Sequence, residues 1–321
     1  MRYKTLIVGL GQIGMGYDSG LDPMEYVYSH ARAFSQHPDF ELIGGVDSNE
    51  HNRETFERLY NCPAYPSVEA ALNLHQPTVL VIAVPTHLHS KILLSALKKS
   101  QLKAVLCEKP LSYDLQESQA MVEACADKGV PLYVNYIRRS DIGVIEVKRR
   151  ITEGEIAGPI KCVVWYSKGF FHNGSHFFNL LEYWLGPMQK SLMLSGGRIL
   201  DNADSEPDVQ IHFERGSAVF LAAWEEAFSH YTIELLSPSG RLRYEQGGKR
   251  IRWQSARPDP NLRDYIVLSE KQEMITSGMD RYQGHVVEQL AKGLNGQDAQ
   301  LCSGEDALRT LKNMKQILGK V

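Results

Sequence analysis

A six-residue run near the N-terminus, Gly9–Gly14, is the sequence feature that most constrains the fold. It has the spacing G-x-G-x-x-G and directly follows Thr5–Val8, a short apolar segment typical of a buried strand. After a strand and before a helix, this spacing predicts a loop that binds the phosphates of a dinucleotide. We expect Gly9 to permit the tight turn, Gly11 to let the backbone approach a pyrophosphate, and Gly14 to allow close packing on the sheet.

The first part of the chain alternates strand-like and helix-like segments. The strand candidates are Thr5–Val8, Leu42–Val46, Val79–Ala83, Ala104–Cys107 and Leu132–Val134. Helical patterns cover residues 50–60, 67–74, 89–98 and 114–128. The strand candidates are continuously apolar, as in a parallel sheet covered on both faces. This alternation predicts a doubly wound α/β Rossmann domain over residues 1–136.

The remaining residues, 137–321, show a different pattern. After a helical stretch at 140–153, strand-like segments dominate, several of them linked by turns that contain glycine. They lie at 160–168, 208–214, 217–225, 230–236, 241–246 and 250–254, with helical patterns at 175–185, 281–293 and 304–317. We expect a second α/β domain with a large, mostly antiparallel open sheet. An exposed sheet face favours a homodimer or homotetramer.

An acidic residue that contacts the adenosine ribose should follow a G-x-G-x-x-G loop by about 20 residues. The candidate, Asp47, lies 33 positions after Gly14. The excess is accounted for if residues 15–28 are an inserted loop. A carboxylate at this place accepts hydrogen bonds from ribose hydroxyls and repels a 2′-phosphate, so it favours NAD over NADP. Arg53 is the one nearby cation that argues the other way, although such a residue is more often a solvated helix side chain.

Two polar segments follow other predicted strands, Val84–His89 and Cys107–Pro110. Ligands bind at the carboxyl ends of strands in open α/β sheets. Lys109 lies between a strand end and a proline, which suits a hydrogen-bond donor held in one place. We expect His89 either to support the backbone or to border the cofactor.

The segment His172–His176 adds two imidazoles from the second domain. If a helix begins near Gly174, then His176, Asn179 and Tyr183 lie on one face of it. A histidine with a pKa of about 6.5 can accept and return a proton at neutral pH. Oxidation of an alcohol needs such a base, because the hydroxyl loses its proton as hydride leaves the carbon. A lysine cation beside that oxygen would stabilise the developing alkoxide.

Taken together, these motifs resemble the Gfo/Idh/MocA family (glucose–fructose oxidoreductase and inositol dehydrogenase) over nearly the whole chain. The resemblance rests on Gly9–Gly14, Asp47, Pro85-Thr86-His87-Leu88-His89, Glu108-Lys109-Pro110, Asn135-Tyr136 with Arg138, and Gly174-Ser175-His176. It implies an NAD(P)-dependent redox reaction on a sugar, nucleotide sugar, cyclitol or related polyol. It also implies that Lys109 contacts the substrate hydroxyl and the nicotinamide side, and that His176 is the acid/base.

The chain departs from the family pattern Asp-x-Gly-x-His-x-x-Asp at both acidic positions, where it has His172 and Asn179. Because His176 and Lys109 remain, the two departures do not exclude redox chemistry, but they leave the substrate and the proton route open. We expect His172 to join the catalytic group and Asn179 to orient His176 or to contact substrate.

The predicted site follows from these motifs. The catalytic residues are Lys109, His176 and His172. The cofactor contacts are Gly9, Gly11, Gln12, Ile13, Gly14, Asp47, Pro85, Thr86, His89, Glu108, Lys109 and Asn135. The substrate contacts are Tyr166, Asn173 and Asn179, with Lys168, Tyr183 and the 15–28 loop as further candidates.

Composition limits the partners. A net charge of −3 gives no support for binding nucleic acid or an anionic membrane surface. No apolar run approaches the roughly 18 residues of a membrane helix. The N-terminus runs into a strand without a signal-peptide pattern, and the five cysteines are scattered, so we expect a reducing, cytoplasmic setting.

Two other functions stay open. His172 and His176 have a spacing found among metal ligands, which would suit a hydrolase or lyase, although no third ligand is evident. We therefore predict no metal site. The second alternative is a dinucleotide-binding sensor or regulator that has kept the fold and lost the reaction.

Overall fold

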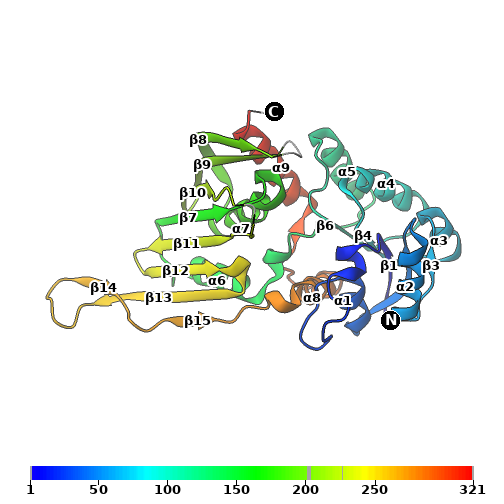
Figure 1. The fold of residues 1–321 in the computed structure, drawn as a ribbon, viewed down its shortest axis with the longest axis horizontal. Coiled ribbons are helices and arrows are strands. Elements are labelled where there is room, and N and C mark those ends of the chain that lie inside the picture. The colour runs from blue at the N-terminus through cyan, green and yellow to red at the C-terminus, as the bar shows by residue number, and fades with distance from the viewer. Residues whose placement is uncertain (1, 201–203, 226, 320–321) are drawn as a thin grey trace. The chain divides into compact units, whose positions relative to one another are not determined.

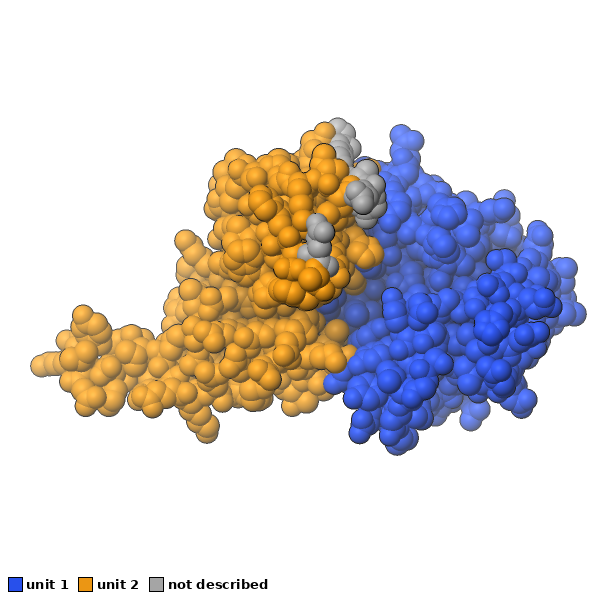
Figure 2. All heavy atoms as spheres, viewed as in Figure 1, with its two compact units in different colours: residues 1–140, 280–309 blue, residues 141–279, 310–321 orange. Residues whose placement is uncertain are grey.

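The computed structural model describes residues 2–200, 204–225 and 227–319. The chain divides into two compact units, residues 1–140 with 280–309, and residues 141–279 with 310–321 (Figure 2). Residues 280–309 thus belong to the first unit, whereas the sequence pattern assigned all of 137–321 to a second domain. The assignment of cofactor binding to one domain and substrate binding to the other stays a prediction. Across the described ranges, no helix has the length and apolar character needed to cross a membrane.

The first unit contains a seven-stranded sheet in the order β16-β6-β5-β4-β1-β2-β3 (Figure 1). The strands are β1 (Tyr3–Val8), β2 (Phe40–Val46), β3 (Ala64–Tyr65), β4 (Val79–Ile82), β5 (Ala104–Cys107), β6 (Leu132–Val134) and β16 (Cys302–Ser303). All neighbours pair in parallel except β16, which pairs antiparallel with β6. The strand order reverses between β1 and β4, which confirms the predicted Rossmann topology.

Helices cover both faces of this sheet. One apolar cluster joins it to α1 (His30–Gln36), α2 (Glu50–Tyr60) and α8 (Tyr282–Leu294). Another joins it to α3 (Val68–Leu74), α4 (His89–Lys99) and α5 (Leu115–Asp127). Every residue of β4 is buried, which explains its continuous apolar run. Four of these helices begin at side chains that accept a hydrogen bond from the first turn: Ser29, Asn49, Ser67 and Asp114.

The second unit contains a nine-stranded sheet in the order β14-β13-β12-β11-β7-β10-β9-β8, with β15 paired to β13. The strands are β7 (Ile160–Tyr166), β8 (Met188–Ile199), β9 (Ser205–Phe213), β10 (Gly216–Ala222), β11 (Thr232–Ser237), β12 (Gly240–Glu245), β13 (Arg250–Pro258), β14 (Ile266–Leu268) and β15 (Glu273–Ile275). The prediction of a mostly antiparallel sheet is confirmed. Among the strands that the structure describes in this sheet, the one parallel pair is β7 with β10, so the strands do not form a simple meander.

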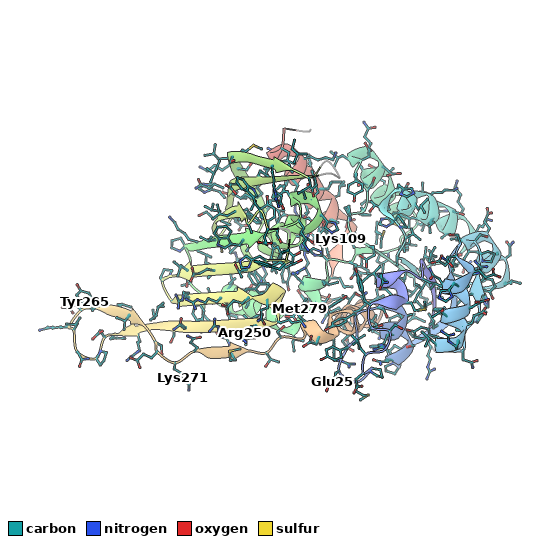
Figure 3. All side chains as sticks on the ribbon, in the orientation of Figure 1. Glu25, Lys109, Arg250, Tyr265, Lys271 and Met279 are labelled. Carbon is teal, nitrogen blue, oxygen red and sulfur yellow. The ribbon has the colours of Figure 1, made fainter. Side chains whose placement is uncertain are left out.

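Helices cover one face of this second sheet, and the other face is open. Residues of α6 (Ile142–Thr152), α7 (Ser175–Leu185) and α9 (Gly304–Ile317) form one apolar cluster with the strands. Along β7, buried and exposed residues alternate, and Val163 and Trp165 point to the open side. Strands β13 to β15 form an arm that extends beyond the neighbouring strands (Figure 1) and has Tyr265 near its far end (Figure 3).

Candidate cofactor and redox site

The glycine loop has the geometry that a dinucleotide requires. Gly9 has a φ of +100°, and a Cβ there would lie 2.4 Å from the carbonyl oxygen of Ala83. A Cβ on Gly14 would lie 2.0 Å from the carbonyl oxygen of Gly9, whereas one on Gly11 would meet no protein atom within 4 Å. Two glycines are thus required by the protein itself, and Gly11 faces open space. This fits the close approach of a pyrophosphate.

The element after this loop is shorter than the sequence pattern suggests. Residues Gln12–Gly16 form a single π-helical turn, and α1 begins only at His30. The amide of Gly16 donates to the carbonyl of Gly11, and the amide of Tyr17 donates to the carbonyl of Gln12. Residues 15–28 therefore separate the glycine loop from α1, as an inserted loop would.

A cavity of about 750 Å³ lies beside the glycine loop in the first unit. Its walls come from the segments that follow β1, β2, β3 and β4 and include Gly9, Gly11, Asp47, Pro85 and Leu88. This volume lies within the range of about 300–1,000 Å³ typical of small-molecule sites. The cavity joins four of the predicted cofactor contacts at the carboxyl edge of one parallel sheet.

Asp47 is held firmly at the end of β2. Its Oδ2 accepts hydrogen bonds from the Leu10 amide at 2.9 Å and from Asn52 Nδ2 at 3.2 Å, and its Oδ1 accepts one from the Asn49 amide at 2.8 Å. Arg53 donates to the backbone carbonyls of Asp47 and Ser48, each at 3.0 Å. The Arg53 guanidinium is therefore bound to main-chain carbonyls. The sequence had suggested two other roles for it, a solvated side chain or a contact to the cofactor.

His89 links two of the predicted cofactor segments. The side chain is buried, and its ring nitrogens lie 2.9 Å from the carbonyl oxygen of Val84 and 3.2 Å from that of Leu111. The imidazole thus bridges the segment before Pro85 and the segment after Lys109. This geometry suits the backbone-supporting role.

Glu108 lies in a polar cluster directly after β5. Its Oε1 is 2.9 Å from His30 Nε2 and 2.6 Å from Asn135 Nδ2, and its Oε2 accepts from the Lys109 amide at 3.3 Å. Burial favours the neutral carboxylic acid, but the hydrogen bonds from His30 and Asn135 and the charge of Lys109 outweigh it. They lower the pKa of Glu108 below its ordinary value. A carboxylate is therefore fixed next to the proposed catalytic lysine.

Gln283 and His30 complete this cluster and were missed in the sequence. Gln283 Nε2 lies 2.6 Å from His30 Nδ1, and Gln283 Oε1 accepts from Asn135 Nδ2 at 3.2 Å. Ser29 marks the start of a helix at His30, but no spacing rule relates His30 to Glu108, 78 positions later. Only the fold brings these residues together.

In the second unit, two acidic residues hold the loop before α7: Asp204, directly before β9, and Glu206, within it. Asp204 accepts hydrogen bonds from the amides of Phe171 and His172 at 3.1 and 2.9 Å. Glu206 accepts one from the amide of Gly169 at 3.0 Å. Gly169 has a φ of +94°, and a Cβ there would lie 2.2 Å from Asp204 Oδ2. The sequence pattern gave no sign of this acidic support.

His172 and His176 lie on the more accessible parts of this segment. His172 is exposed in the turn Phe170–Gly174, and His176 is half-buried in the first turn of α7. Nearly every other residue of α7 is buried, and Tyr183 is the second half-buried one, two turns after His176. His176 and Tyr183 therefore share one face of the helix, as predicted from the spacing.

Two of the predicted substrate contacts have structural roles in this unit. Tyr166 is fully buried, and its hydroxyl donates to the carbonyl of Pro207 at 2.6 Å. Asn179 is also buried, and its Nδ2 donates to Thr310 Oγ1 at 3.0 Å. Tyr166 lies on the covered face of β7 and Asn179 on the buried side of α7, so both positions belong to the core, which side-chain type alone does not reveal. We therefore leave both out of the proposed substrate contacts.

Asn173 is held by its own unit, since its Nδ2 donates to the carbonyl of Ser167 at 3.1 Å and to the Tyr231 hydroxyl at 2.7 Å. Lys168 is exposed next to it with a φ of +62°.

Over the part of the chain that the structure describes, no group of three or more His, Cys, Asp or Glu side chains is arranged to hold a metal ion.

Comparisons with known proteins agree with this architecture. Residues 3–136 match the model of an oxidoreductase family described as having an NAD-binding Rossmann fold. A scyllo-inositol 2-dehydrogenase (NAD(+)) of Bacillus subtilis is 33% identical over 247 residues, which are 68% of this chain and 66% of that protein. A 2,7-anhydro-N-acetylneuraminate hydratase of Escherichia coli is 23% identical over 254 residues, 71% of this chain and 65% of that protein. The chain thus matches just under two thirds of the length of these relatives.

Solved structures share the fold over the whole chain. The WlbA dehydrogenase of Bordetella pertussis, solved with NADH and UDP-GlcNAcA, has a TM-score of 0.75 at 19% identity, covering 100% of this chain and 96% of that one. The sheet order, the glycine loop and the Glu108-Lys109-Pro110 motif agree with the family match. The chain belongs to the Gfo/Idh/MocA family of oxidoreductases, with an NAD-binding Rossmann fold in its first unit.

Proposed function

We propose that this chain is an NAD-dependent oxidoreductase that transfers hydride between the nicotinamide ring and a hydroxyl-bearing carbon of a sugar, nucleotide sugar or cyclitol. One observation carries the proposal. At the carboxyl edge of a single parallel sheet, the glycine loop follows β1, Asp47 follows β2 and Lys109 follows β5. The space above Gly11 is open, so the residues present fit a dinucleotide.

A bound nicotinamide cofactor would supply the hydride acceptor for oxidation and the hydride donor for reduction. Lys109 donates a hydrogen bond to the substrate oxygen and stabilises the negative charge that develops on it. His176 takes the hydroxyl proton as general base and returns it in the reverse direction. These two roles rest on the order of the motifs Glu108-Lys109-Pro110 and Gly174-Ser175-His176 along the chain. His172 is proposed as a polar neighbour of the substrate, because it is exposed in the adjoining turn.

The choice of NAD over NADP rests on the charges at the edge of the cavity. The Asp47 carboxylate has its orientation fixed by two backbone amides, and a second acidic residue, Glu69, lines the same cavity together with one lysine, Lys91. Arg53 is bound to main-chain carbonyls. A 2′-phosphate would meet a carboxylate at close range, and desolvated like charges cost several kcal/mol.

The experiment is a turnover assay with sugars, nucleotide sugars and cyclitols, in which both nicotinamide absorbance and products are measured. Product analysis is needed because one relative is a hydratase. We expect Lys109→Ala and His176→Ala to lower kcat by about 100- to 10,000-fold, with the Kd for NADH within about threefold of wild type because neither residue lies in the cavity beside the glycine loop. Lys128→Ala and His51→Ala, at exposed positions, serve as controls. Near-normal turnover in either site variant would refute the assigned roles.

A dinucleotide-binding sensor is the second candidate. The observation that favours it is the pair of non-acidic residues, His172 and Asn179, where the family pattern has carboxylates. A sensor binds NADH tightly and changes neither the absorbance nor the composition of any substrate mixture. Substrate-dependent turnover that is lost in Lys109→Ala would exclude this candidate.

A further inference from the structure

His30 lies at the centre of the polar cluster behind Glu108 and has no part in the chemistry described above. Its side chain is fully buried, and its Nε2 lies 2.9 Å from Glu108 Oε1. A charge-assisted hydrogen bond of this kind is roughly twice as strong as one between neutral groups. The carboxylate is therefore held by α1 as well as by β5.

Gln283 fixes which nitrogen of His30 carries the proton. Its Nε2 amide, which can only donate, lies 2.6 Å from His30 Nδ1. Gln283 Oε1 accepts from Asn135 Nδ2, and this sets the direction of the amide. Nδ1 is therefore an acceptor, and Nε2 carries the hydrogen that is donated to Glu108. The imidazole is held as one tautomer by two residues from distant parts of the chain.

The inserted loop, residues 15–28, secures this arrangement from the α1 side. Asp18 is fully buried, and its carboxylate accepts hydrogen bonds from the amides of Tyr28 and Ser29 at 2.8 and 2.9 Å. Its Oδ1 also accepts one from the Ser29 hydroxyl at 2.7 Å. Because Ser29 is the N-cap of α1, the loop fixes the backbone at the residue directly before His30.

The same loop secures the α8 side. The amide of Gln283 donates to the carbonyl of Val27 at 3.2 Å, and the amide of Val27 donates to the carbonyl of Asp280 at 3.0 Å. The Tyr28 hydroxyl donates to Asp280 Oδ1 at 2.8 Å, and the Tyr28 ring stacks on Tyr282. One short loop thus holds both His30 and the residue that sets its tautomer.

The titratable groups that face Glu108 come from three elements. They are His30 on α1, Lys109 and Cys107 at the end of β5, and Tyr282 on α8. Among them Lys109 is the cation, and its own backbone amide donates to Glu108 Oε2. A shift of the Glu108 carboxylate would therefore act directly on the lysine next to it in the chain.

We propose that His30 is a positioning residue that orients the Glu108 carboxylate and, through it, Lys109, and that the 15–28 loop serves to hold His30 in this role. The proposal rests on the function proposed for Lys109. It gives a structural role to residues 15–28, the insertion that lengthens the spacing between the glycine loop and Asp47.

The kinetic test compares three variants. His30→Leu removes the donor, and His30→Gln keeps an amide hydrogen at the place of Nε2. His37→Gln is the matched control, because His37 follows the end of α1 and pairs with Glu288 at 3.1 Å in the same kind of contact. We expect kcat to fall about 30-fold in His30→Leu and less than about fivefold in His30→Gln, with KM for NAD within about threefold in both. The control should match wild type.

The pH dependence adds a readout that a merely structural role would leave unchanged. His30 stabilises ionised Glu108, so losing the donor raises the pKa of that carboxyl. In the reductive direction, protonated His176 is the active form and does not set the acidic limb of the kcat profile. There we expect this limb to move upward by about one pH unit in His30→Leu and to return in His30→Gln. If His30→Leu and His30→Gln lost kcat equally and the acidic limb of their pH profiles stayed at the wild-type position, the proposal would be overturned.

A substrate-independent measurement separates this proposal from the proposed function and needs no variant that might misfold. In ¹⁵N-histidine-labelled wild-type protein, we expect His30 to show the Nε2–H tautomer at neutral pH. In wild-type protein with ¹³C-dimethylated lysines, the Lys109 signal should report the ionisation of Glu108 as an acid inflection. A wild type without turnover would contradict the proposed function alone. The opposite tautomer, or no inflection at Lys109, would refute the role of His30.

Discussion

Alanine substitutions at Gly9 and Gly11 should separate the two reasons for which a dinucleotide loop needs glycine. In Gly9→Ala, the new Cβ would lie 2.4 Å from the Ala83 carbonyl oxygen, and the residue would keep a φ of +100°. A left-handed backbone costs an L residue about 1–2 kcal/mol, and overpacking adds about 1–3 kcal/mol. We expect the free energy of unfolding of the first unit to fall by about 2–5 kcal/mol.

Gly11→Ala should act on the ligand alone. Gly11 has a φ of −72°, which alanine adopts readily, and its Cβ would meet no protein atom within 4 Å. The free energy of unfolding should therefore stay within about 0.5 kcal/mol of wild type. The methyl group would occupy the space proposed for the pyrophosphate. We expect NADH to bind at least about 30-fold more weakly, because neither the loop nor the bound pyrophosphate can move away without losing its contacts.

Urea denaturation, followed by signals from the first unit, gives the two stabilities, and NADH fluorescence titration gives the two affinities. The NADH titrations are done without urea and well below the temperature at which Gly9→Ala unfolds, so that loss of affinity is not confused with loss of folded protein. Normal NADH affinity in Gly11→Ala would refute the placement of the pyrophosphate over this loop. Equal destabilisation by both substitutions would refute the claim that the protein itself constrains Gly9 but not Gly11.

Two further predictions concern cofactor choice and assembly. Asp47→Ala should weaken NADH binding by about tenfold and narrow the preference over NADPH, because it removes the acceptor for ribose and the repulsion of a 2′-phosphate; equal binding of both cofactors by wild type would contradict this. Trp165→Glu should shift a homodimer or homotetramer towards smaller species in light scattering, because Trp165 lies 40% exposed on the open face of the second sheet. An unchanged mass would exclude that part of the face from the interface.

The first unit was predictable because its sequence signals are local. The segments Val79–Ile82 and Ala104–Cys107 are apolar throughout and buried on both faces, so their strands could be recognised from the sequence. In the second unit, the twelve-residue strand Met188–Ile199 was missed. It is an edge strand that contains Gly196 and Gly197 and is largely exposed, so it lacks the alternation that marks a half-buried strand.

The site was predictable to the same extent. The glycine loop, Asp47 and Lys109 follow strands, and strand order alone brings them to one edge. Tyr166 was assigned to the substrate as a polar side chain, and Asn179 because it stands where the family pattern has an acid. Both are buried, with partners 41 and 131 positions away. Long-range partners of this kind leave no trace in local spacing, and the same is true of His30 and Gln283.

Residues 280–309 belong to the first unit, so the cofactor site depends on more than residues 3–136, which match the family model. Helix α8 packs Val286, Val287 and Leu290 into the same cluster as Ile7 and Val81 of the sheet. Without α8, that sheet face would be open to water, at a cost of about 25 cal/mol for each Å² of apolar surface. Residues 3–136 therefore carry the cofactor motifs, but their sheet is closed by a helix from beyond residue 279. The same helix brings Gln283 to His30, so the residue pair behind Lys109 forms only when α8 has packed against the first part of the chain.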